Sequence, residues 1–308
     1  MKTEKSRLEK VLEKNFLAVT SECGPPRGSD PSEIIEKAEL LKDHVDAINI
    51  TDNQTAMTRM SSLAACIHVK QLGLEPVLQM VTRDRNRIAL QSDVLGAASH
   101  GIKNVLCLSG DHQSFGDCKS GQNVHDIDSM QLVQTIRYMR DEGKFLGGDD
   151  IKVPPQMFVG AAANPFADPY EIRIPRLAKK VASGAEFIQT QCIYNLDKFE
   201  DWMKRVVDRG LHEKVHILAG MTPMKSAGMA KYMKNRVPGM DVPDELVKRL
   251  SDTPKEEQAQ KGIDICIEDI QRLKEIDGLH GFHIMAIEWE EKVPEIVEKA
   301  GLYPRPSI

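Results

Sequence analysis

The sequence predicts a closed α/β barrel of the (β/α)8, or TIM, type with an extra N-terminal helix. Eight short runs of apolar and β-branched residues alternate with stretches whose apolar residues have helical spacing. A strand followed by a helix, repeated along a chain, requires parallel strands joined by right-handed crossovers. The 308 residues fit one such barrel, so we expect a single catalytic domain over 1–308, with 1–15 as the additional helix.

Turn residues separate the expected elements. The predicted strands are 16–21, 45–51, 76–81, 104–109, 157–164, 187–191, 216–221 and 281–287. The predicted helices are 33–42, 59–71, 86–99, 129–141, 170–183, 197–209 and 258–275, with a further short helix inside 235–255 and a long connection at 142–156. Gly73, Gly101 and Gly184 each lie between a helix and a strand, where a left-handed cap is needed. An open doubly wound sheet stays as the alternative, because periodicity does not show closure.

Composition narrows the class of partner and the compartment. The 41 Lys and Arg residues are interspersed with 46 Asp and Glu, for a net charge of −5, so we expect neither nucleic acid nor an anionic membrane as partner. No apolar run reaches the roughly 18 residues of a membrane span, and the N-terminus lacks the apolar core of a secretion signal. The six cysteines show no paired spacing, which indicates a reducing, cytoplasmic location.

Polar residues recur on one face of several predicted strands, near their carboxyl ends. Strand side chains alternate in direction, so these polar residues are expected to point into the barrel together. They are Thr20 and Glu22, Asn49 and Thr51, Gln79, Cys107 with Ser109 and Asp111, and Gln189 with Gln191. Barrel enzymes build their active sites at this end, and unpaired buried polar groups are costly, so we expect a ligand pocket there. The alternative is a hydrogen-bonded polar layer with interior water.

Several motifs of other enzyme classes do not occur. The sequence has no G-x-G-x-x-G after a strand, no G-x-x-x-x-G-K-[ST] loop and no G-x-S-x-G elbow. The pairs His280-x-x-His283 and Cys66-x-His68 lack nearby third and fourth ligands, so we interpret both as structural and predict no metal site.

Five short motifs, in chain order, resemble the methylenetetrahydrofolate reductase family. Glu22-Cys23-Gly24-Pro25-Pro26-Arg27 is similar to the E-F-F-P-P-R segment that ends the first strand of the family. The other four are Ile50-Thr51 for V-T, Leu108-Ser109-Gly110-Asp111 for L-R-G-D, Thr190-Gln191 for T-Q and Phe282-His283 for F-H. The similarity extends over residues 16–304, and the motifs fall on the matching strands.

The resemblance implies flavin-dependent reduction of 5,10-methylenetetrahydrofolate to 5-methyltetrahydrofolate in one-carbon metabolism. FAD is favoured over FMN, and NAD(P)H or a redox partner is the expected electron donor. By the same resemblance Glu22 is the general acid that protonates folate N10, Asp111 lies beside flavin and pterin, and Gln191 binds the pterin. Flavin contacts are implied for Thr51, Gln79, Ser109, Gly110, Asp111, Asn164, Lys179 and Lys180.

Some positions depart from the family pattern. Ala227 stands where a stacking aromatic is usual, Trp289 where an arginine serves the folate tail, and Asn164 where a tyrosine contacts the flavin. These changes resemble the subgroup of acetogenic anaerobes, whose barrel pairs with a zinc-containing iron–sulfur or corrinoid-type subunit. A homo-oligomer or such a complex is therefore expected. The alternatives are a pterin methyltransferase barrel and a non-catalytic flavin or scaffold subunit of a redox complex.

Overall fold

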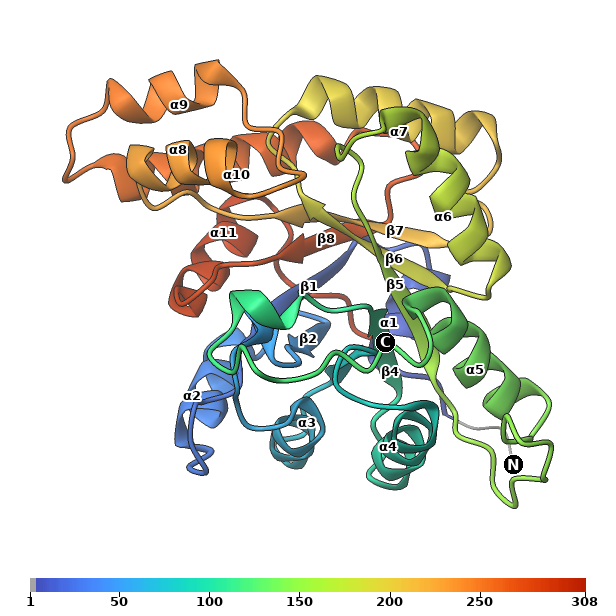
Figure 1. The fold of residues 1–308 in the computed structure, drawn as a ribbon. Helices are drawn as coiled ribbons and strands as arrows, with labels where there is room; N and C mark the ends of the chain where they lie inside the picture. Colours follow the sequence, from blue (N-terminus) through green and yellow to red (C-terminus); the bar gives the residue numbers. More distant parts are fainter. Residues whose placement is uncertain (1–3) are drawn as a thin grey trace.

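The strands form a closed parallel barrel in the order β1 to β8, as the computed structural model of residues 4–308 shows (Figure 1). The strands are β1 Ala18–Cys23, β2 Ala47–Ile50, β3 Pro76–Val81, β4 Asn104–Leu108, β5 Phe158–Ala163, β6 Phe187–Cys192, β7 His216–Met221 and β8 Gly281–Ile284. β8 pairs with β1, with Ala18 opposite Gly281, and this pairing closes the sheet. The predicted barrel is thereby confirmed, and the open doubly wound sheet is excluded.

Helices cover the outside of the barrel between successive strands. They are α2 Ser32–Leu41, α3 Ser62–Gln71, α4 Arg87–Ser99, α5 Ser129–Asp141, α6 Arg173–Ala182, α7 Leu196–Asp208, α8 Ala227–Arg236, α9 Asp244–Ser251, α10 Gln258–Leu273 and α11 Val293–Lys299. Each predicted helix has a counterpart here, and α9 is the short helix expected inside 235–255. α8 and α11 were not predicted, because α8 buries only two alanines and a methionine and α11 is one of the shortest helices. No helix among the residues described is long and apolar enough to span a membrane.

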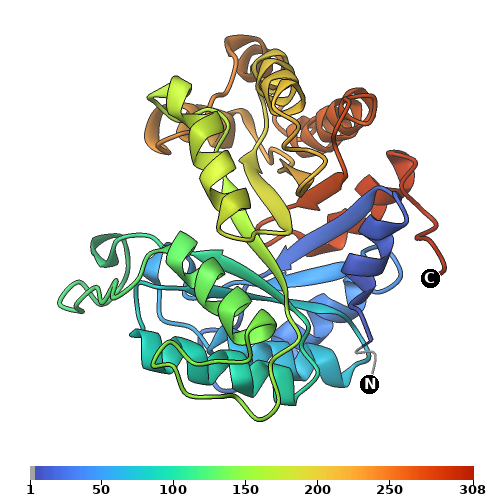
Figure 2. The ribbon, with the colours of Figure 1, turned by 90° about the vertical axis from the view of Figure 1, so that its right-hand side faces the viewer.

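A short helix closes the N-terminal end of the barrel. α1 (Arg7–Glu13) begins at Ser6, whose side chain accepts a hydrogen bond from the Glu9 amide. It lies within the predicted 1–15 helix, of which residues 1–3 are outside the described range. Its buried Leu8, Val11 and Leu12 pack on the first inward residues of the strands, including Phe158. Both termini lie at this end, away from the loop that follows β4 (Figure 2). The polar residues of a site are therefore expected at the opposite end, where the strands have their carboxyl ends.

The strand register corrects one sequence expectation, on β4. Gln79 of β3 pairs with Leu106 and Val81 with Leu108, so both leucines face the barrel interior. Cys107 packs outward among the helices, and the prediction that it points inward was wrong. In a parallel barrel both faces of a strand are buried, so an apolar alternation does not show which face is which.

Candidate active site

Glu22 is the penultimate residue of β1 and lies on the inner face of the barrel, and its side chain is only 12% exposed. Gln79 Nε2 donates to its Oε2 at 3.1 Å, and Gln54 Nε2 donates to its Oε1 at 3.3 Å. Burial raises the pKa of Glu22, while the two amide hydrogen bonds oppose that rise. A carboxyl group that keeps its proton closer to neutral pH than an ordinary glutamate is suited to general acid catalysis.

Buried hydrogen bonds join the inward side chains of β1, β2, β6 and β8 below Glu22. Gln189 Nε2 donates to Thr20 Oγ1 at 3.0 Å and to Asn49 Oδ1 at 3.1 Å, and Asn49 Nδ2 donates back to Gln189 Oε1 at 2.7 Å. Thr20 Oγ1 also lies 2.9 Å from His283 Nδ1 and 3.5 Å from the Phe282 carbonyl oxygen. The inward direction predicted for Thr20, Asn49 and Gln189 is confirmed.

His283 lies between the buried polar residues and Glu22. Burial lowers the pKa of His283 to about 3, so the ring is neutral at physiological pH and carries one N–H. Its Nδ1 faces Thr20 Oγ1, and its Nε2 lies 3.9 Å from Glu22 Oε2. The sequence placed His283 in a motif, but its link to the acid depends on the tertiary structure.

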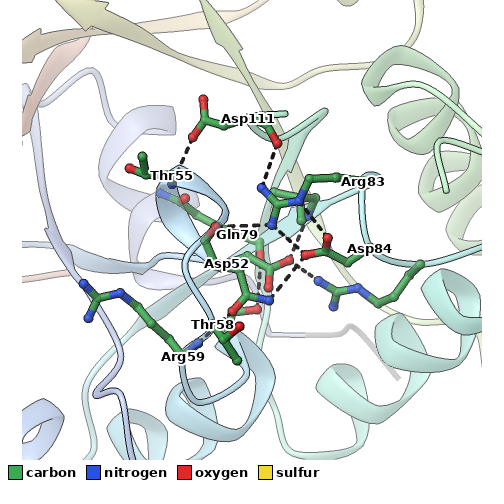
Figure 3. A network of polar contacts seen from close by, with 12 residues as sticks. Asp52, Thr55, Thr58, Arg59, Gln79, Arg83, Asp84 and Asp111 are labelled. Atoms are coloured by element: carbon green, nitrogen blue, oxygen red, sulfur yellow. Dashed lines mark hydrogen bonds and ion pairs between the residues drawn. The ribbon is translucent and has the colours of Figure 1, made fainter. Parts of the chain in front are cut away.

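Asp111 lies just beyond β4 and is exposed. Its Oδ2 accepts the Thr55 backbone N–H at 3.0 Å, and its own carbonyl accepts Arg83 Nη1 at 3.0 Å (Figure 3). Thr55 belongs to the 3-10 turn η1 (Gln54–Ala56), whose first residue reaches Glu22. A single short turn therefore contacts both Glu22 and Asp111.

Arg83 links the loops that follow β2, β3 and β4. It is 3% exposed, pairs with Asp84 through Nε at 2.7 Å and Nη2 at 2.6 Å, and also donates to the Asn53 carbonyl at 3.2 Å (Figure 3). Nearby, Asp52 accepts the Val81 N–H at 2.9 Å and forms an ion pair with Arg85. Sequence reasoning missed this network, although alternating charges directly after a buried strand were a signal for it.

Gly110 turns the chain between β4 and Asp111. Its φ is +84°, and a Cβ there would lie 3.1 Å from Val81 Cβ. We expect Gly110→Ala to lower stability by about 1–2 kcal/mol and to weaken cofactor binding, because Asp111 and Ser109 must move. Urea unfolding and cofactor titration measure the two effects. Gly28→Ala is the control, since a Cβ at Gly28 meets nothing within 4 Å; equal behaviour of the two variants would contradict the prediction.

Gln191 lies at the carboxyl end of β6, beside an irregularity in the strand. The register shifts between Gln189 and Cys192, so Cys192 rather than Gln191 pairs with Gly220. Gln191 Oε1 accepts the Cys192 N–H at 3.2 Å, while its Nε2 donates to no group among residues 4–308. Gln191 shares the barrel end with Glu22 and Asp111 but bonds to neither of them. Its free amide remains available to a ligand.

The other predicted site residues differ in their surroundings. Thr51 is buried, and its Oγ1 has no partner among the described residues. Asn164 is used internally: it accepts the N–H groups of Phe166 and Ala167 at 2.9 and 3.0 Å and donates to a loop carbonyl. Lys180 donates to the Ala162 carbonyl, and burial lowers its pKa to about 8. Ser109 and Lys179 are exposed, and Lys179 lies on the outer surface of α6.

Further buried polar atoms without partners gather on the loops after β2, β3 and β4. Besides Thr51 Oγ1, they are Arg59 Nε, Thr82 Oγ1, Arg85 Nε, Gln113 Oε1 and Asn123 Oδ1. Buried polar groups are normally paired, so such a concentration indicates where a polar ligand would be accommodated.

Comparison with known proteins points to one family. A family model described as methylenetetrahydrofolate reductase matches residues 7–301. Methylenetetrahydrofolate reductase 2 of Schizosaccharomyces pombe is 29% identical over 223 residues, which cover 67% of this chain and 32% of that protein. A probable methylenetetrahydrofolate reductase (NADPH) of Caenorhabditis elegans is 22% identical over 313 residues, covering 96% of this chain and 44% of that protein. The chain thus spans less than half the length of these curated relatives.

A solved structure has the same fold. It is an uncharacterized protein from Clostridium thermocellum, described as binding two copies of 5-methyl-5,6,7,8-tetrahydrofolic acid, with a TM-score of 0.64 and 14% identity. The match covers 95% of this chain and 97% of that one. At this identity the likeness concerns the fold alone.

Proposed function

The chain belongs to the methylenetetrahydrofolate reductase family, and on that premise we propose that it reduces 5,10-methylenetetrahydrofolate to 5-methyltetrahydrofolate with a bound flavin. The observation that carries the proposal is the environment of Glu22. Its carboxyl group is buried at the catalytic end of a barrel, its pKa is raised by that burial, and two amides hold its oxygens. The C. thermocellum neighbour, described as a methyltetrahydrofolate binder, supports a folate as ligand.

In the proposed reaction Glu22 first donates its proton to N10 of the folate. The bond between N10 and the methylene carbon then breaks, its electron pair stays on N10, and the carbon becomes an iminium on N5. When bound, a reduced flavin supplies the hydride that this carbon accepts. Asp111 and Gln191 hold the pterin ring, with the Gln191 Nε2 donor free for that task. Holding the reactants in place converts a bimolecular encounter into an oriented one.

The residues at the strand ends fit a flavin. A flavin pyrimidine edge alternates donors and acceptors, and the site offers a hydroxyl, amides and a carboxylate to match it. The unpartnered Thr51 Oγ1, deep at the end of β2, supports this fit. We propose that the residues holding the cofactor are Thr51, Gln79, Ser109, Gly110, Asp111, Asn164, Lys179 and Lys180. FAD is favoured over FMN by family resemblance.

The proposed electron donor is NAD(P)H or a redox partner subunit. The C. elegans relative is named for NADPH. In this chain Ala227, the first residue of α8, offers no aromatic face for a nicotinamide ring, which favours a partner. We propose a cytoplasmic protein with one catalytic barrel domain, working as a homo-oligomer or with a zinc or iron–sulfur subunit.

A visible absorption spectrum tests the proposal most directly. We expect the purified protein to show flavin bands and to release a flavin that mass measurement identifies. Once its flavin has been reduced, addition of methylenetetrahydrofolate should restore the spectrum of the oxidised flavin. NADH oxidation by the isolated chain, compared with reduction by an artificial dye, separates the two electron donors. A colourless protein that binds methyltetrahydrofolate would favour a pterin methyltransferase. Flavin without folate binding would favour a non-catalytic redox subunit.

A further inference from the structure

The η1 turn has an unfavourable backbone conformation. Asn53, Thr55 and Ala56 have φ values of +46°, +56° and +56°, and none of them is glycine. Left-handed backbone is costly for residues with a Cβ, and most of all for a β-branched residue such as Thr55. Such strain persists only where surrounding contacts hold it, and it concentrates at functional sites.

Contacts from two neighbouring loops and from its own loop hold η1 in place. Arg83 Nη2 donates to the Asn53 carbonyl at 3.2 Å, and the Asn53 side chain accepts the Arg59 N–H at 3.0 Å (Figure 3). On the far side, a Cβ at Gly116 would lie 1.8 Å from the Ala56 carbonyl oxygen, so the loop after β4 packs directly on the turn.

The same turn occupies oxygens of both site carboxylates. Gln54 Nε2 donates to Glu22 Oε1 at 3.3 Å, and the Thr55 N–H donates to Asp111 Oδ2 at 3.0 Å. Gln79 already occupies the other oxygen of Glu22. A substrate nitrogen that is to receive the Glu22 proton, and a ring that is to bind Asp111, therefore meet groups already paired within the chain.

We infer that η1 is a specificity-determining segment: Gln54 and Thr55 occupy the places that groups of a reduced pterin take at Glu22 and Asp111, and they give way only to a ligand that engages both of these residues. The inference rests on the proposed function. A reduced pterin carries ring and amino N–H groups for one carboxylate and the N10 arm for the other. A ligand that reaches only one carboxylate leaves the contact of η1 with the other carboxylate intact. Moving η1 would then leave that other carboxylate unpaired, which lowers the affinity for such a ligand.

Two substitutions in η1 should change folate affinity in opposite directions. Gln54→Met removes a contact of the closed turn, so calorimetry with 5-methyltetrahydrofolate should show about two- to tenfold tighter binding. The same substitution should reduce the ratio of the affinity for 5-methyltetrahydrofolate to the affinity for a pterin that lacks the N10 arm. Thr55→Gly relieves the strain of the closed turn, so binding should weaken by about three- to tenfold while thermal stability rises.

A remote glycine substitution provides the matched control. Asp43 is exposed, has a φ of +68° and lies on the connection between α2 and β2. Asp43→Gly should raise thermal stability as Thr55→Gly does and leave folate affinity unchanged. If Asp43→Gly and Thr55→Gly give the same folate affinity, the role of η1 in selection is refuted.

Hydrogen exchange on the wild-type holoenzyme gives an independent readout. Adding 5-methyltetrahydrofolate should accelerate exchange of the Thr55 amide, because its acceptor on Asp111 is taken by the ligand. A pterin that lacks the N10 arm and so reaches only one of the carboxylates should leave that rate unchanged. Folate binding with an unchanged or slower Thr55 amide would overturn this inference and leave the proposed function standing. Absence of any folate binding would overturn both.

Discussion

Replacing Glu22 by glutamine is expected to lower the rate of folate reduction by about 10²- to 10⁴-fold while flavin remains bound. Glutamine matches glutamate in size, and Gln79 or Gln54 can turn its amide so that its oxygen accepts from the new NH2 group, but an amide cannot protonate N10. The measurement is single-turnover reoxidation of the reduced enzyme by methylenetetrahydrofolate, with the flavin content read from the visible spectrum. Glu36→Gln, an exposed carboxyl on α2, is the control and should behave as wild type.

The pH dependence follows from the direction of the Glu22 pKa shift. Burial raises that pKa, so the acid form persists to higher pH than in an ordinary glutamate. The rate of the wild-type reaction should therefore be highest below the raised pKa and fall as pH increases through it. Glu22→Gln should lose this limb of the profile. A variant that keeps more than about a tenth of the wild-type rate would rule out the general acid role.

Replacing Asp46 by alanine is expected to destabilise the fold by about 3–5 kcal/mol, because it leaves buried positive charge without its partner. The Asp46 side chain is 0% exposed and accepts the Val19 N–H at 2.9 Å, Arg7 Nη2 at 3.1 Å and Arg305 Nη2 at 2.5 Å. One carboxylate thus ties α1, β1 and the C-terminal segment together. For a chain of this size the melting temperature should fall on the order of 10 °C.

Urea unfolding followed by circular dichroism measures the loss at Asp46. Glu36→Ala removes an exposed carboxyl group from a helix and should cost less than about 0.5 kcal/mol. Arg305→Met combined with Asp46→Ala should cost clearly less than the sum of the two single changes, because the second removes a charge already left unpaired. Additive effects would show that Asp46 and Arg305 do not form an energetic unit.

Much of the candidate site could be predicted from local pattern. Alternation on β1, β2 and β6 placed Thr20, Asn49 and Gln189 inside the barrel, and their mutual hydrogen bonds confirm it. The same reasoning failed on β4, where Leu106 and Cys107 are both suited to a buried position. At the end of β6 the register shift makes Cys192 rather than Gln191 the partner of Gly220, and no local signal announces such a bulge.

The number, order and approximate bounds of the strands could be predicted from the amino-acid sequence, and so could the barrel end at which Glu22, Asp111 and Gln191 lie. The spacing of hydrophobic residues and the order of the elements are local properties, so they can be read without knowing which distant residues are in contact. The contacts of Gln54 and Thr55 with the two carboxylates, the joining of three loops by Arg83, and the approach of His283 to Glu22 became visible only in the folded barrel. These contacts join residues far apart in the chain, and they exist only once the barrel has closed and its loops have packed.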